Sequence, residues 1–461
     1  MTTHSVHIAS LGCARNDVDS EELAARLEHG GFTLVDDPET AETVVVNTCG
    51  FVAQAKKDSI DTLLAAADLK DGGMVKSVVA VGCMAERYGV ELAAELPEAD
   101  AVLGFDAYAD IAERLRGILD GEKAISHVPR DRRKLLPLTP SARPAAAPEV
   151  AVPGHVWLPG ARRRLMGGPS ASLKIASGCD RRCAFCAIPA FRGSYLSRPI
   201  DELEAEARWL VQEGAKELFL VSENTSSYGK DMGADVRLEQ LLDRLSQVDG
   251  LDWIRVSYLQ PAEIRPGFVE SMLSIDKVVP YFDLSFQHAS RTVLRRMRRF
   301  GDPDSFLDLI GRIRAIAPEA GIRSNVIAGF PGETDEDVQT LRDFIIAAQL
   351  DVLGVFGYSD EEGTEGVSLP DHLPDDVIEE RRAMLADVAV DVAEARAADR
   401  IGDTVVVLVE SNEDGETTGR AEHQAPETDG AVTLDREAPV GSLVSARVVD
   451  SEGIDLIAEA L

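Results

Sequence analysis

Cysteine is scarce in this sequence, and so is any long hydrophobic run. Only six of the 461 residues are cysteine, too few for a disulfide scaffold in so long a chain. No stretch reaches the roughly 20 consecutive apolar residues that a membrane-spanning helix needs. The first residues, MTTHSVHIASLGC, lack the basic and apolar segments of a signal peptide. We therefore expect a cytoplasmic protein without membrane contact, in which clustered cysteines bind metal.

Positive charge is also in short supply. Lys and Arg number 47 against 80 Asp and Glu, which gives a formal net charge of -33. A surface of this sign repels phosphate backbones and anionic lipid, so we expect no strong direct binding to nucleic acid. Two explanations of the imbalance stay open: a generally acidic proteome and a basic protein partner.

The length favours about three domains, and the first 125 residues have the pattern of an α/β domain. The β-branched runs SVHIASLGC, VVVNTCGF and SVVAVGC are each followed by a helical pattern, the last of them over residues 84–97. Ser20 is the predicted N-cap of the first helix, and Gly30-Gly31 its stop. Such repeats predict a parallel sheet flanked by helices.

Residues 126–168 differ from the regions on either side of them. LPLTPSARPAAAPEVAVPGH is rich in Pro and Ala, and ARRRLM adds a basic turn. This composition predicts an irregular linker between two domains rather than a folded unit.

A second series of βα units occupies residues 169–400. Its six candidate strands are SLKIAS, ELFLVS, WIRVSY, YFDLSF, IRSNVIA and VLGVFGY. Six units predict a partial or complete TIM-type (βα)6 barrel, with chemistry on the loops that follow the strands. The Ala-, Arg- and Glu-rich segment 374–400 is predicted to be a helix that closes this domain.

Residues 401–461 read as short strands separated by turns, which predicts a small β-barrel. This segment holds 14 Asp or Glu and 3 Arg, a net charge of -11. An even distribution of the whole charge would give a segment of this length only about -4. The C-terminal domain is therefore more acidic than the rest of an overall α/β chain.

The strongest motif is SGCDRRCAFCAIP. Cys179, Cys183 and Cys186 form a CxxxCxxC set directly after the strand SLKIAS. Three thiolates hold three irons of a 4Fe-4S cluster and leave the fourth iron free to bind a small molecule. A zinc site is the alternative, but structural zinc takes four protein ligands, and no fourth Cys or His lies close in sequence.

The other three cysteines share one local context. Cys13, Cys49 and Cys83 each follow a predicted strand and precede a helix, with gaps of 36 and 34 residues. The ends of parallel strands lie at one edge of a sheet, so neighbouring strands bring three such sulfurs together. Three buried structural cysteines are the alternative, since free cysteine is often buried.

With an aromatic residue before its third cysteine, CxxxCxxC resembles the motif of the radical S-adenosylmethionine superfamily. Together with the N-terminal cysteines, it makes the chain similar to the methylthiotransferase family of these enzymes, whose C-terminal domain is an OB-like barrel called TRAM. The resemblance implies S-adenosylmethionine and two 4Fe-4S clusters as cofactors. Cys179, Cys183 and Cys186 then hold the cluster that cleaves S-adenosylmethionine. Cys13, Cys49 and Cys83 hold a second cluster, which carries the sulfur.

Weaker motifs supply further candidates. Asn16 and Asn47 fit the family pattern near the second cluster. Six residues are candidates for binding the cofactor S-adenosylmethionine: Glu223 and Asn224 in SENTSSYG, Gln287 and His288 in SFQHAS, Gly329 in AGFPGET, and Arg198 in SRP. Structural roles compete with each of these assignments. The basic run RRMRR (295–299) is predicted to be a solvated helix face, with RNA contact as the alternative. No acid–base catalytic residue is predicted, because the cofactor supplies the hard step.

The resemblance leaves two substrate classes. One branch of the family modifies adenosine in transfer RNA, and the other modifies the β-carbon of an aspartate in the twelfth small-subunit ribosomal protein. A C-terminal domain of charge -11 repels RNA and suits a basic ribosomal protein, free or on the assembled ribosome. SENTSSYG and SLGCARN also favour the second branch. We expect an electron donor such as flavodoxin or ferredoxin. A transfer RNA methylthiotransferase and a non-catalytic iron–sulfur sensor on the ribosome are the alternatives.

Overall fold

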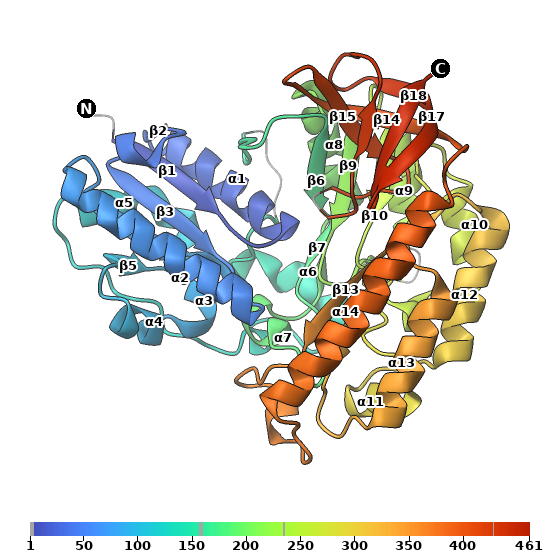
Figure 1. Cartoon of the computed structure of the whole chain (residues 1–461). Coiled ribbons are helices and arrows are strands. Elements are labelled where there is room, and N and C mark those ends of the chain that lie inside the picture. Colours follow the sequence, from blue (N-terminus) through green and yellow to red (C-terminus); the bar gives the residue numbers. More distant parts are fainter. Residues whose placement is uncertain (1–3, 156–159, 234–235, 427) are drawn as a thin grey trace.

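The structure is a computed structural model that describes all residues except 1–3, 156–159, 234–235 and 427 (Figure 1). Three folded parts follow one another along the chain: an N-terminal α/β domain, a parallel half-barrel and a small closed β-barrel. No helix among the described residues is long and apolar enough to cross a membrane.

The N-terminal domain contains a five-stranded parallel sheet of order β2-β1-β3-β4-β5. Its strands are β1 (Ser5–Ser10), β2 (Thr33–Leu34), β3 (Thr43–Thr48), β4 (Ser77–Val81) and β5 (Ala101–Val102). The helices are α1 (Ala14–His29), α2 (Ala53–Asp68), α3 (Gly82–Tyr88), α4 (Val90–Glu95) and α5 (Ile111–Leu119). The predicted parallel α/β domain is confirmed. The three predicted strands β1, β3 and β4 are direct neighbours.

Both faces of this sheet are buried, which explains why its strands are uninterrupted apolar runs. Val45 and Val79 pack in the core formed with α1 and α5. Val44, Val46 and Val78 pack on the other face, in the core formed with α2, α3 and α4.

Two details of the predicted helices are wrong. Helix α1 begins at Ala14, directly after Cys13, so Ser20 lies inside the helix, where its hydroxyl donates to Ser10 Oγ at 2.9 Å. The helix predicted over residues 84–97 is interrupted at Gly89, whose φ of +44° no regular helix contains. The first helix starts directly where β1 ends, and at Gly89 the backbone packs so closely on His127 that a β-carbon would collide with its carbonyl oxygen. These tertiary contacts outweigh the local helix signals.

The segment between the first two domains has only short helical turns among its described residues: η4 (Arg132–Lys134), η5 (Pro140–Ala142), α6 (Arg143–Ala146) and η6 (Ala147–Glu149). It is nevertheless packed against its neighbours. Arg132 is 2% exposed and pairs with Glu86 at 2.9 Å, while Arg143 is 4% exposed and pairs with Asp180 at 2.7 Å. The segment is therefore fixed to both domains by buried arginines and is not a free spacer.

The central domain is an open parallel half-barrel. Its six strands are β6 (Ser170–Lys174), β9 (Glu217–Val221), β10 (Trp253–Val256), β11 (Tyr281–Asp283), β12 (Gly321–Ala328) and β13 (Val352–Gly357). They form the sheets β10-β9-β6 and β11-β12-β13, which parallel bridges join at Ile254–Val278 and Leu259–Leu284. The six predicted strands and the predicted partial barrel are confirmed.

Helices cover the outside of this half-barrel (Figure 1). They are α8 (Ile200–Gln212), α9 (Leu238–Ser246), α10 (Phe268–Leu273), α11 (Arg291–Arg296), α12 (Pro303–Ile316), α13 (Asp335–Ala348) and α14 (Asp375–Ala398). Helix α14 is the closing helix predicted from residues 374–400, and Figure 1 shows it running toward the C-terminal barrel. A short antiparallel pair, β7 (Ala176–Ser177) with β8 (Leu196–Ser197), and helix α7 (Ile188–Arg192) frame the CxxxCxxC loop.

The predicted C-terminal barrel is confirmed as a closed barrel of order β14-β15-β16-β18-β17. Its strands are β14 (Thr404–Glu413), β15 (Glu416–Ala421), β16 (Val432–Leu434), β17 (Leu443–Glu452) and β18 (Asp455–Ala460). Arg420 of this barrel pairs with Glu217, the first residue of β9, which also accepts from Arg255 Nε at 2.6 Å. The barrel therefore lies at the amino ends of the parallel strands, opposite the ends that lead into the functional loops.

Candidate functional site

The three N-terminal cysteines lie at the carboxyl ends of three adjacent strands: Cys13 after β1, Cys49 after β3 and Cys83 after β4. Two glycines allow the loops to approach closely. A β-carbon at Gly12, whose φ is +104°, would lie 2.9 Å from Cys49 Sγ. One at Gly50 would lie 3.0 Å from the carbonyl carbon of Cys83. The backbone around each cysteine thus packs against the next, and the sheet places the three cysteines at one edge.

These thiols are free, and two of them are strongly buried. Cys49 and Cys83 are each 8% exposed. Burial raises the pKa of Cys49 above its usual value and that of Cys83 to about 12, although the charge of Arg192 partly offsets the effect on Cys83. Thiols in such surroundings stay protonated near neutral pH unless a metal takes the proton's place, since metal binding releases thiol protons.

Two asparagines connect the strand ends beside these cysteines. Asn16 Nδ2 donates to Leu11 O at 2.7 Å and to Asn47 O at 3.2 Å. Asn47 Nδ2 donates to Asn16 O at 2.9 Å and to Ser20 Oγ at 2.7 Å. Asn16 Oδ1 lies 3.9 Å from Cys83 Sγ. Asn16 therefore holds the end of β1 against the end of β3, and Asn47 holds the first turns of α1 against β3, next to the cysteine set.

The second cysteine set lies on the loop between β7 and α7: Cys179, Cys183 and Cys186. The backbone N–H of Cys179 donates to Gly193 O, and that of Ala184 donates to Met297 O, each at 3.1 Å. Burial raises the pKa of Cys179 and brings that of Cys186 to about 12. The loop is therefore anchored at both ends by the backbone of its own domain.

Each set offers the three thiols that a 4Fe-4S cluster with one open iron requires. In the described part of the chain, no three His, Cys, Asp or Glu side chains are arranged around a single metal ion. A cubane takes one thiolate at each of three different irons, so its ligands stand farther apart than those of one ion. The residues present fit two such clusters, one in each domain.

Arg15 connects the two sets from the N-terminal side. Its Nη1 donates to Ser222 O of the half-barrel at 3.1 Å, and its Nη2 lies 3.6 Å from Cys13 Sγ. The guanidinium lies over the ring of Tyr258, 4.8 Å from its centre. Its charge also reaches Cys186, where it partly offsets the burial that raises the pKa of that thiol. Arg15 therefore lies between the first cysteine set and the second.

Arg192 makes the reverse connection from the half-barrel. Its Nη2 donates to Cys83 Sγ at 3.0 Å and its Nη1 to Asp19 Oδ2 at 2.6 Å. Asp19 also accepts from Lys174 Nζ at 2.7 Å. Burial alone would raise the pKa of Asp19, but the two cations outweigh it and hold the pKa below its usual value. A buried, fully paired ion cluster thus fixes the domain interface beside Cys83.

Two buried oxygens of the SENTSSYG loop lack partners among the described residues: Oε2 of Glu223 and Oδ1 of Asn224. The other carboxylate oxygen of Glu223 lies 4.0 Å from Arg15 Nε. An unpaired buried acceptor is costly, and both oxygens suit a ligand that carries hydroxyl or ammonium groups. Glu223 and Asn224 therefore each present an unpaired acceptor, and their contact with S-adenosylmethionine stays a prediction.

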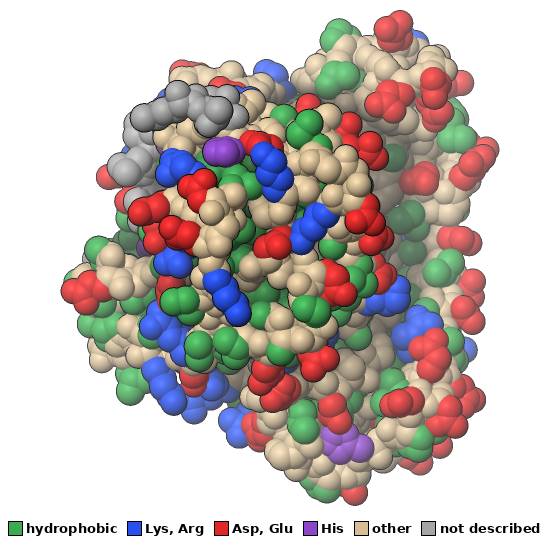
Figure 2. Space-filling view, turned by 90° about the vertical axis from the view of Figure 1, so that its left-hand side faces the viewer, with side chains coloured by type: hydrophobic (Ala, Val, Ile, Leu, Met, Phe, Trp, Pro, Cys, Tyr) green, Lys and Arg blue, Asp and Glu red, His purple; other side chains and the backbone are tan. Residues whose placement is uncertain are grey.

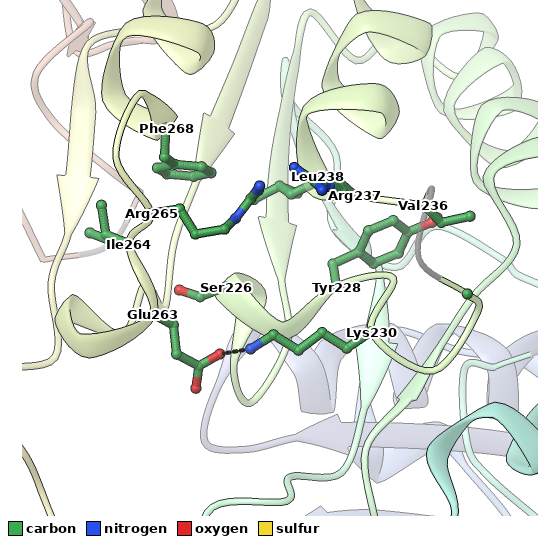
Figure 3. Close-up of a pocket in the computed structure, with 11 residues that line it drawn as sticks. Ser226, Tyr228, Lys230, Val236, Arg237, Leu238, Glu263, Ile264, Arg265 and Phe268 are labelled. Carbon is green, nitrogen blue, oxygen red and sulfur yellow. Dashed lines mark hydrogen bonds and ion pairs between the residues drawn. The ribbon is translucent and has the colours of Figure 1, made fainter.

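Glu263 was not predicted and joins this loop to the CxxxCxxC loop. It accepts from Arg181 Nε at 2.6 Å, from Asn224 Nδ2 at 3.1 Å and from Ser227 Oγ at 2.7 Å. Burial would raise its pKa, but hydrogen bonds from Lys230 and Ser227 and the charge of Arg181 lower it to about 2. Figure 3 shows Lys230 pointing at Glu263 in a cavity of about 380 Å³ that no cysteine lines.

A cavity of about 200 Å³ lies between the two domains on the other side of the CxxxCxxC loop. Phe51, Phe185, Gln287 and Asn325 are among the residues that line it. Gln287 has a φ of +71°, and its N–H donates to Asn325 O at 2.9 Å. The predicted residue Gln287 is therefore held at a strand end that opens into a space with apolar and amide walls.

Glu361 closes this cavity against the N-terminal domain. Its carboxylate accepts from Lys56 Nζ at 3.0 Å and from Arg87 Nη1 at 2.7 Å. The loop after β13 is thereby fixed to α2 and α3, and the interface that contains the cavity has an ion-paired edge.

His288 and Gly329 belong to one hydrogen-bonded loop. The N–H of Ser290 donates to His288 Nδ1 at 2.9 Å, so the proton lies on Nε2, which contacts Glu333 Oε2 at 3.1 Å. The other oxygen of Glu333 accepts from Gly329 N at 2.9 Å. His288 is fully buried. These contacts hold the loop in place, and contact of either residue with S-adenosylmethionine stays a prediction.

Arg198 uses its donors within the protein. It donates to Glu206 at 2.6 Å, to Lys174 O at 2.8 Å and to His155 O at 3.0 Å. Binding of S-adenosylmethionine by Arg198 likewise stays a prediction. The contacts show a buried ion pair behind β6.

The interpretation of RRMRR as a solvated face is wrong for two of its members. Met297 is fully buried, and Arg299 is 7% exposed. Arg299 Nη1 lies 3.8 Å from Cys183 Sγ, and its other amine donates to Ser285 O. The run ends a short helix directly behind the CxxxCxxC loop, so tertiary packing buries residues that composition predicts to be exposed.

Sequence reasoning missed Arg15, Arg192 and Arg299, the three arginines that approach cysteine sulfurs. Arg15 had a local signal, because it lies two residues after Cys13 in GCAR. Arg192 and Arg299 are 109 and 116 residues from the cysteines they contact, so no local pattern identifies them.

Comparison with protein families divides the chain into three matched regions. Residues 5–104 match the uncharacterized protein family UPF0004, residues 173–345 the radical SAM superfamily and residues 401–461 the TRAM domain. The second match contains the CxxxCxxC loop, and the first contains the other three cysteines.

Relatives match nearly the whole chain. Ribosomal protein uS12 methylthiotransferase RimO of Cutibacterium acnes is 64% identical over 98% of this chain and 97% of its own length. The protein of the same name from Saccharopolyspora erythraea is 60% identical over 99% of this chain and 95% of its own length. The radical S-adenosylmethionine methyltransferase TsrM of Kitasatospora setae has a TM-score of 0.53 at 16% identity, covering 77% of this chain and 73% of its own. This last likeness shows the fold alone.

Proposed function

The chain belongs to the RimO family of ribosomal protein uS12 methylthiotransferases, and from this membership we propose that it adds a methylthio group to an aspartate of uS12. The observation that supports the proposal most directly is the meeting of two three-cysteine sets at one domain interface. Arg15 and Arg192 each reach across that interface to the other domain. An enzyme that cleaves a cofactor at one centre and carries sulfur at another needs this proximity.

The enzyme uses two 4Fe-4S clusters and S-adenosylmethionine. We propose that Cys13, Cys49 and Cys83 hold one cluster, and that Cys179, Cys183 and Cys186 hold the other. When bound, these cofactors supply the radical chemistry that an unactivated C–H bond requires and that acid–base side chains cannot provide.

The remaining site residues bind the cofactor or hold the loops of the site in position. The free oxygens of Glu223 and Asn224 accept hydrogen bonds from the hydroxyl or ammonium groups of S-adenosylmethionine. Gln287 and Asn325 present amides to the interdomain cavity, and Phe51 and Phe185 give it an aromatic wall. His288 acts through Glu333, by fixing the loop of Gly329.

The acidic C-terminal barrel attracts the basic substrate protein. Its net charge of -11 complements a basic ribosomal protein and repels RNA. Because the barrel lies at the amino ends of the strands, its contact with substrate is remote from the cysteine loops. We propose that it increases the rate of encounter rather than shaping the reaction site. We propose that the reaction takes place in the cytoplasm and that flavodoxin or ferredoxin donates the electrons.

Mass spectrometry of uS12 and transfer RNA from a strain that lacks this gene tests the proposal. We expect uS12 to lose a methylthio group on one aspartate, and a plasmid copy of the gene to restore it. Loss of a methylthio group from transfer RNA alone would assign the chain to the other substrate class. Unchanged uS12 and unchanged transfer RNA would leave a non-catalytic role.

A further inference from the structure

Basic side chains from three distant parts of the chain meet around the outer side of the CxxxCxxC loop. They come from DRRK (131–134) with Arg143, from DRRC (180–183) and from RRMRR (295–299). Together they line an open cavity of about 690 Å³, which Cys179, Cys183 and Cys186 also line. The basic members, here called the basic rim, are Arg133, Lys134, Arg143, Arg181, Arg182 and Arg298.

The charge of this cavity is opposite to that of the protein. Six Lys or Arg line it against three acidic residues, Asp131, Asp180 and Glu365. The whole chain has 47 basic residues against 80 acidic ones. Figure 2 shows the same unevenness on one face, where Lys and Arg gather toward the lower left while the right-hand edge is mainly acidic.

Three members of the basic rim extend into solvent, whereas Arg143 is buried. Side chains of Lys134, Arg133 and Arg298 are 81%, 54% and 49% exposed. Leu138, in the same cavity wall, is 88% exposed and adds an apolar contact point. Exposed charges around a small apolar contact suit a short-lived encounter, and redox partners form the smallest protein interfaces.

The CxxxCxxC loop has two different sides. Its three cysteines line the basic cavity, while Phe185 lines the separate 200 Å³ cavity together with Gln287. A protein seated on the basic rim therefore touches the loop that holds the cluster without entering the cavity on the other side. Such a position serves electron delivery and leaves the cavity on the other side open.

We propose that the basic rim is the docking surface for an acidic one-electron carrier protein of the flavodoxin type. The inference rests on the proposed function, because it needs a cluster on Cys179, Cys183 and Cys186. In each encounter the carrier is oxidised by one electron and the cluster is reduced by one, with no bond made or broken. The same positive charge repels the basic substrate protein, so reductant and substrate approach different faces.

The test compares two reductants on the reconstituted holoenzyme. Arg133→Glu and Lys134→Glu, alone and together, reverse charge outside the cysteine loop. Arg342→Glu, on the outer helix α13, is the matched control, since Arg342 is 41% exposed and lines none of these cavities. Reduction of the clusters is followed by stopped-flow absorbance, with flavodoxin hydroquinone or with the methyl viologen radical cation, at low and high salt.

We expect the double variant to slow reduction by flavodoxin about tenfold or more at low salt, and high salt to slow the parent enzyme toward the variant. The methyl viologen rate should not fall, because charge reversal does not repel a small cation. An unchanged flavodoxin rate, or an equal loss in Arg342→Glu, would overturn the docking surface. The docking surface would also be overturned if the double variant lost ribosome binding but was reduced by flavodoxin at the normal rate. That result would assign the basic rim to RNA phosphates. Production of 5'-deoxyadenosine with methyl viologen tests the proposed function separately.

Discussion

Arg192 of the half-barrel donates a hydrogen bond to the sulfur of Cys83 in the N-terminal domain, with 3.0 Å between Nη2 and Sγ. Arg15 makes the reverse connection, from the first cysteine set to Ser222 of the half-barrel. Hydrogen bonds to cluster sulfurs and nearby charge set the reduction potential of an iron–sulfur centre. Through these two arginines, the docking of the two domains therefore affects the charge around each cysteine set.

Replacing Arg192 should change both the interface and the second cluster. Arg192→Met leaves the buried Asp19 with Lys174 as its remaining cation, so the loss of one charged hydrogen bond should lower the free energy of unfolding by about 1.5–3 kcal/mol. Loss of the donor to Cys83 should also shift the potential of the N-terminal cluster to a lower value. Potentiometric titration followed by electron paramagnetic resonance measures that shift. A potential equal to that of the parent, in protein with full iron content, would show that Arg192 is only a packing residue.

Removing Cys49 should separate the two centres. Cys49→Ala should reduce the iron content after anaerobic reconstitution from about eight to about four per chain. Sulfur insertion should be lost, while cleavage of S-adenosylmethionine to 5'-deoxyadenosine continues. Cys179→Ala is the complementary variant, and it should abolish cleavage. Full iron content in Cys49→Ala would contradict the assignment of this residue as a ligand.

The close approach of Gly12 to Cys49 predicts a sharp effect of one methyl group. A β-carbon at Gly12 would lie 2.7 Å from Cys49 Cβ, on a backbone with a φ of +104°. Gly12→Ala should therefore lower the free energy of unfolding by about 1–3 kcal/mol. The variant should also lose the iron of the N-terminal cluster. Gly31→Ala is a matched control, because Gly31 has a φ of +84° but no atom within 4 Å of the added carbon. Equal iron loss in both variants would attribute the effect to backbone conformation alone.

Glu223 should contribute to cofactor binding without contributing to cluster assembly. Glu223→Gln replaces a carboxylate whose Oε2 has no partner among the described residues. A hydrogen bond to a charged group contributes about 1.5–3 kcal/mol and one to a neutral group about 0.5–1.5 kcal/mol, so we expect S-adenosylmethionine to bind about tenfold more weakly. Equilibrium dialysis measures the affinity, and iron analysis should remain at the parental value. Unchanged affinity would exclude this contact.

Acid should weaken the attachment of the C-terminal barrel. Burial would raise the pKa of Glu217, but Arg420 and Arg255 outweigh it and lower the pKa to about 2. A lowered carboxylate pKa stabilises the fold above the unfolded-state value, near 4.3, and this stabilisation is lost as the pH falls toward 2. It amounts to on the order of 3 kcal/mol.

Urea titrations of the parent and of Glu217→Gln measure this contribution. The parent should be more stable above about pH 5, and the difference should shrink toward pH 2, where Glu217 is protonated and resembles glutamine. A difference in stability between parent and variant that does not change with pH would show that the two buried arginines do not stabilise the fold through the charge of Glu217.

Much of the architecture follows from local pattern. Alternation of β-branched runs with helical segments predicted the parallel sheet and the six half-barrel strands, because buried parallel strands are continuously apolar. The details that failed depend on context. Ser20 has the chemistry of an N-cap, but the helix starts seven residues earlier, at the end of β1. RRMRR looks solvated, although Arg299 is packed behind Cys183.

The sequence by itself determined the candidate cluster ligands. The CxxxCxxC spacing places three thiols on one loop, and three strand-end cysteines one βα repeat apart must meet at one sheet edge. Only the tertiary structure decided what surrounds them. Arg192 and Cys83 are 109 residues apart, and the basic rim gathers side chains from segments 131–143, 180–183 and 295–299. Such contacts form when the domains dock. Their energies depend on the distances between the interacting groups, and no local spacing in the sequence specifies those distances.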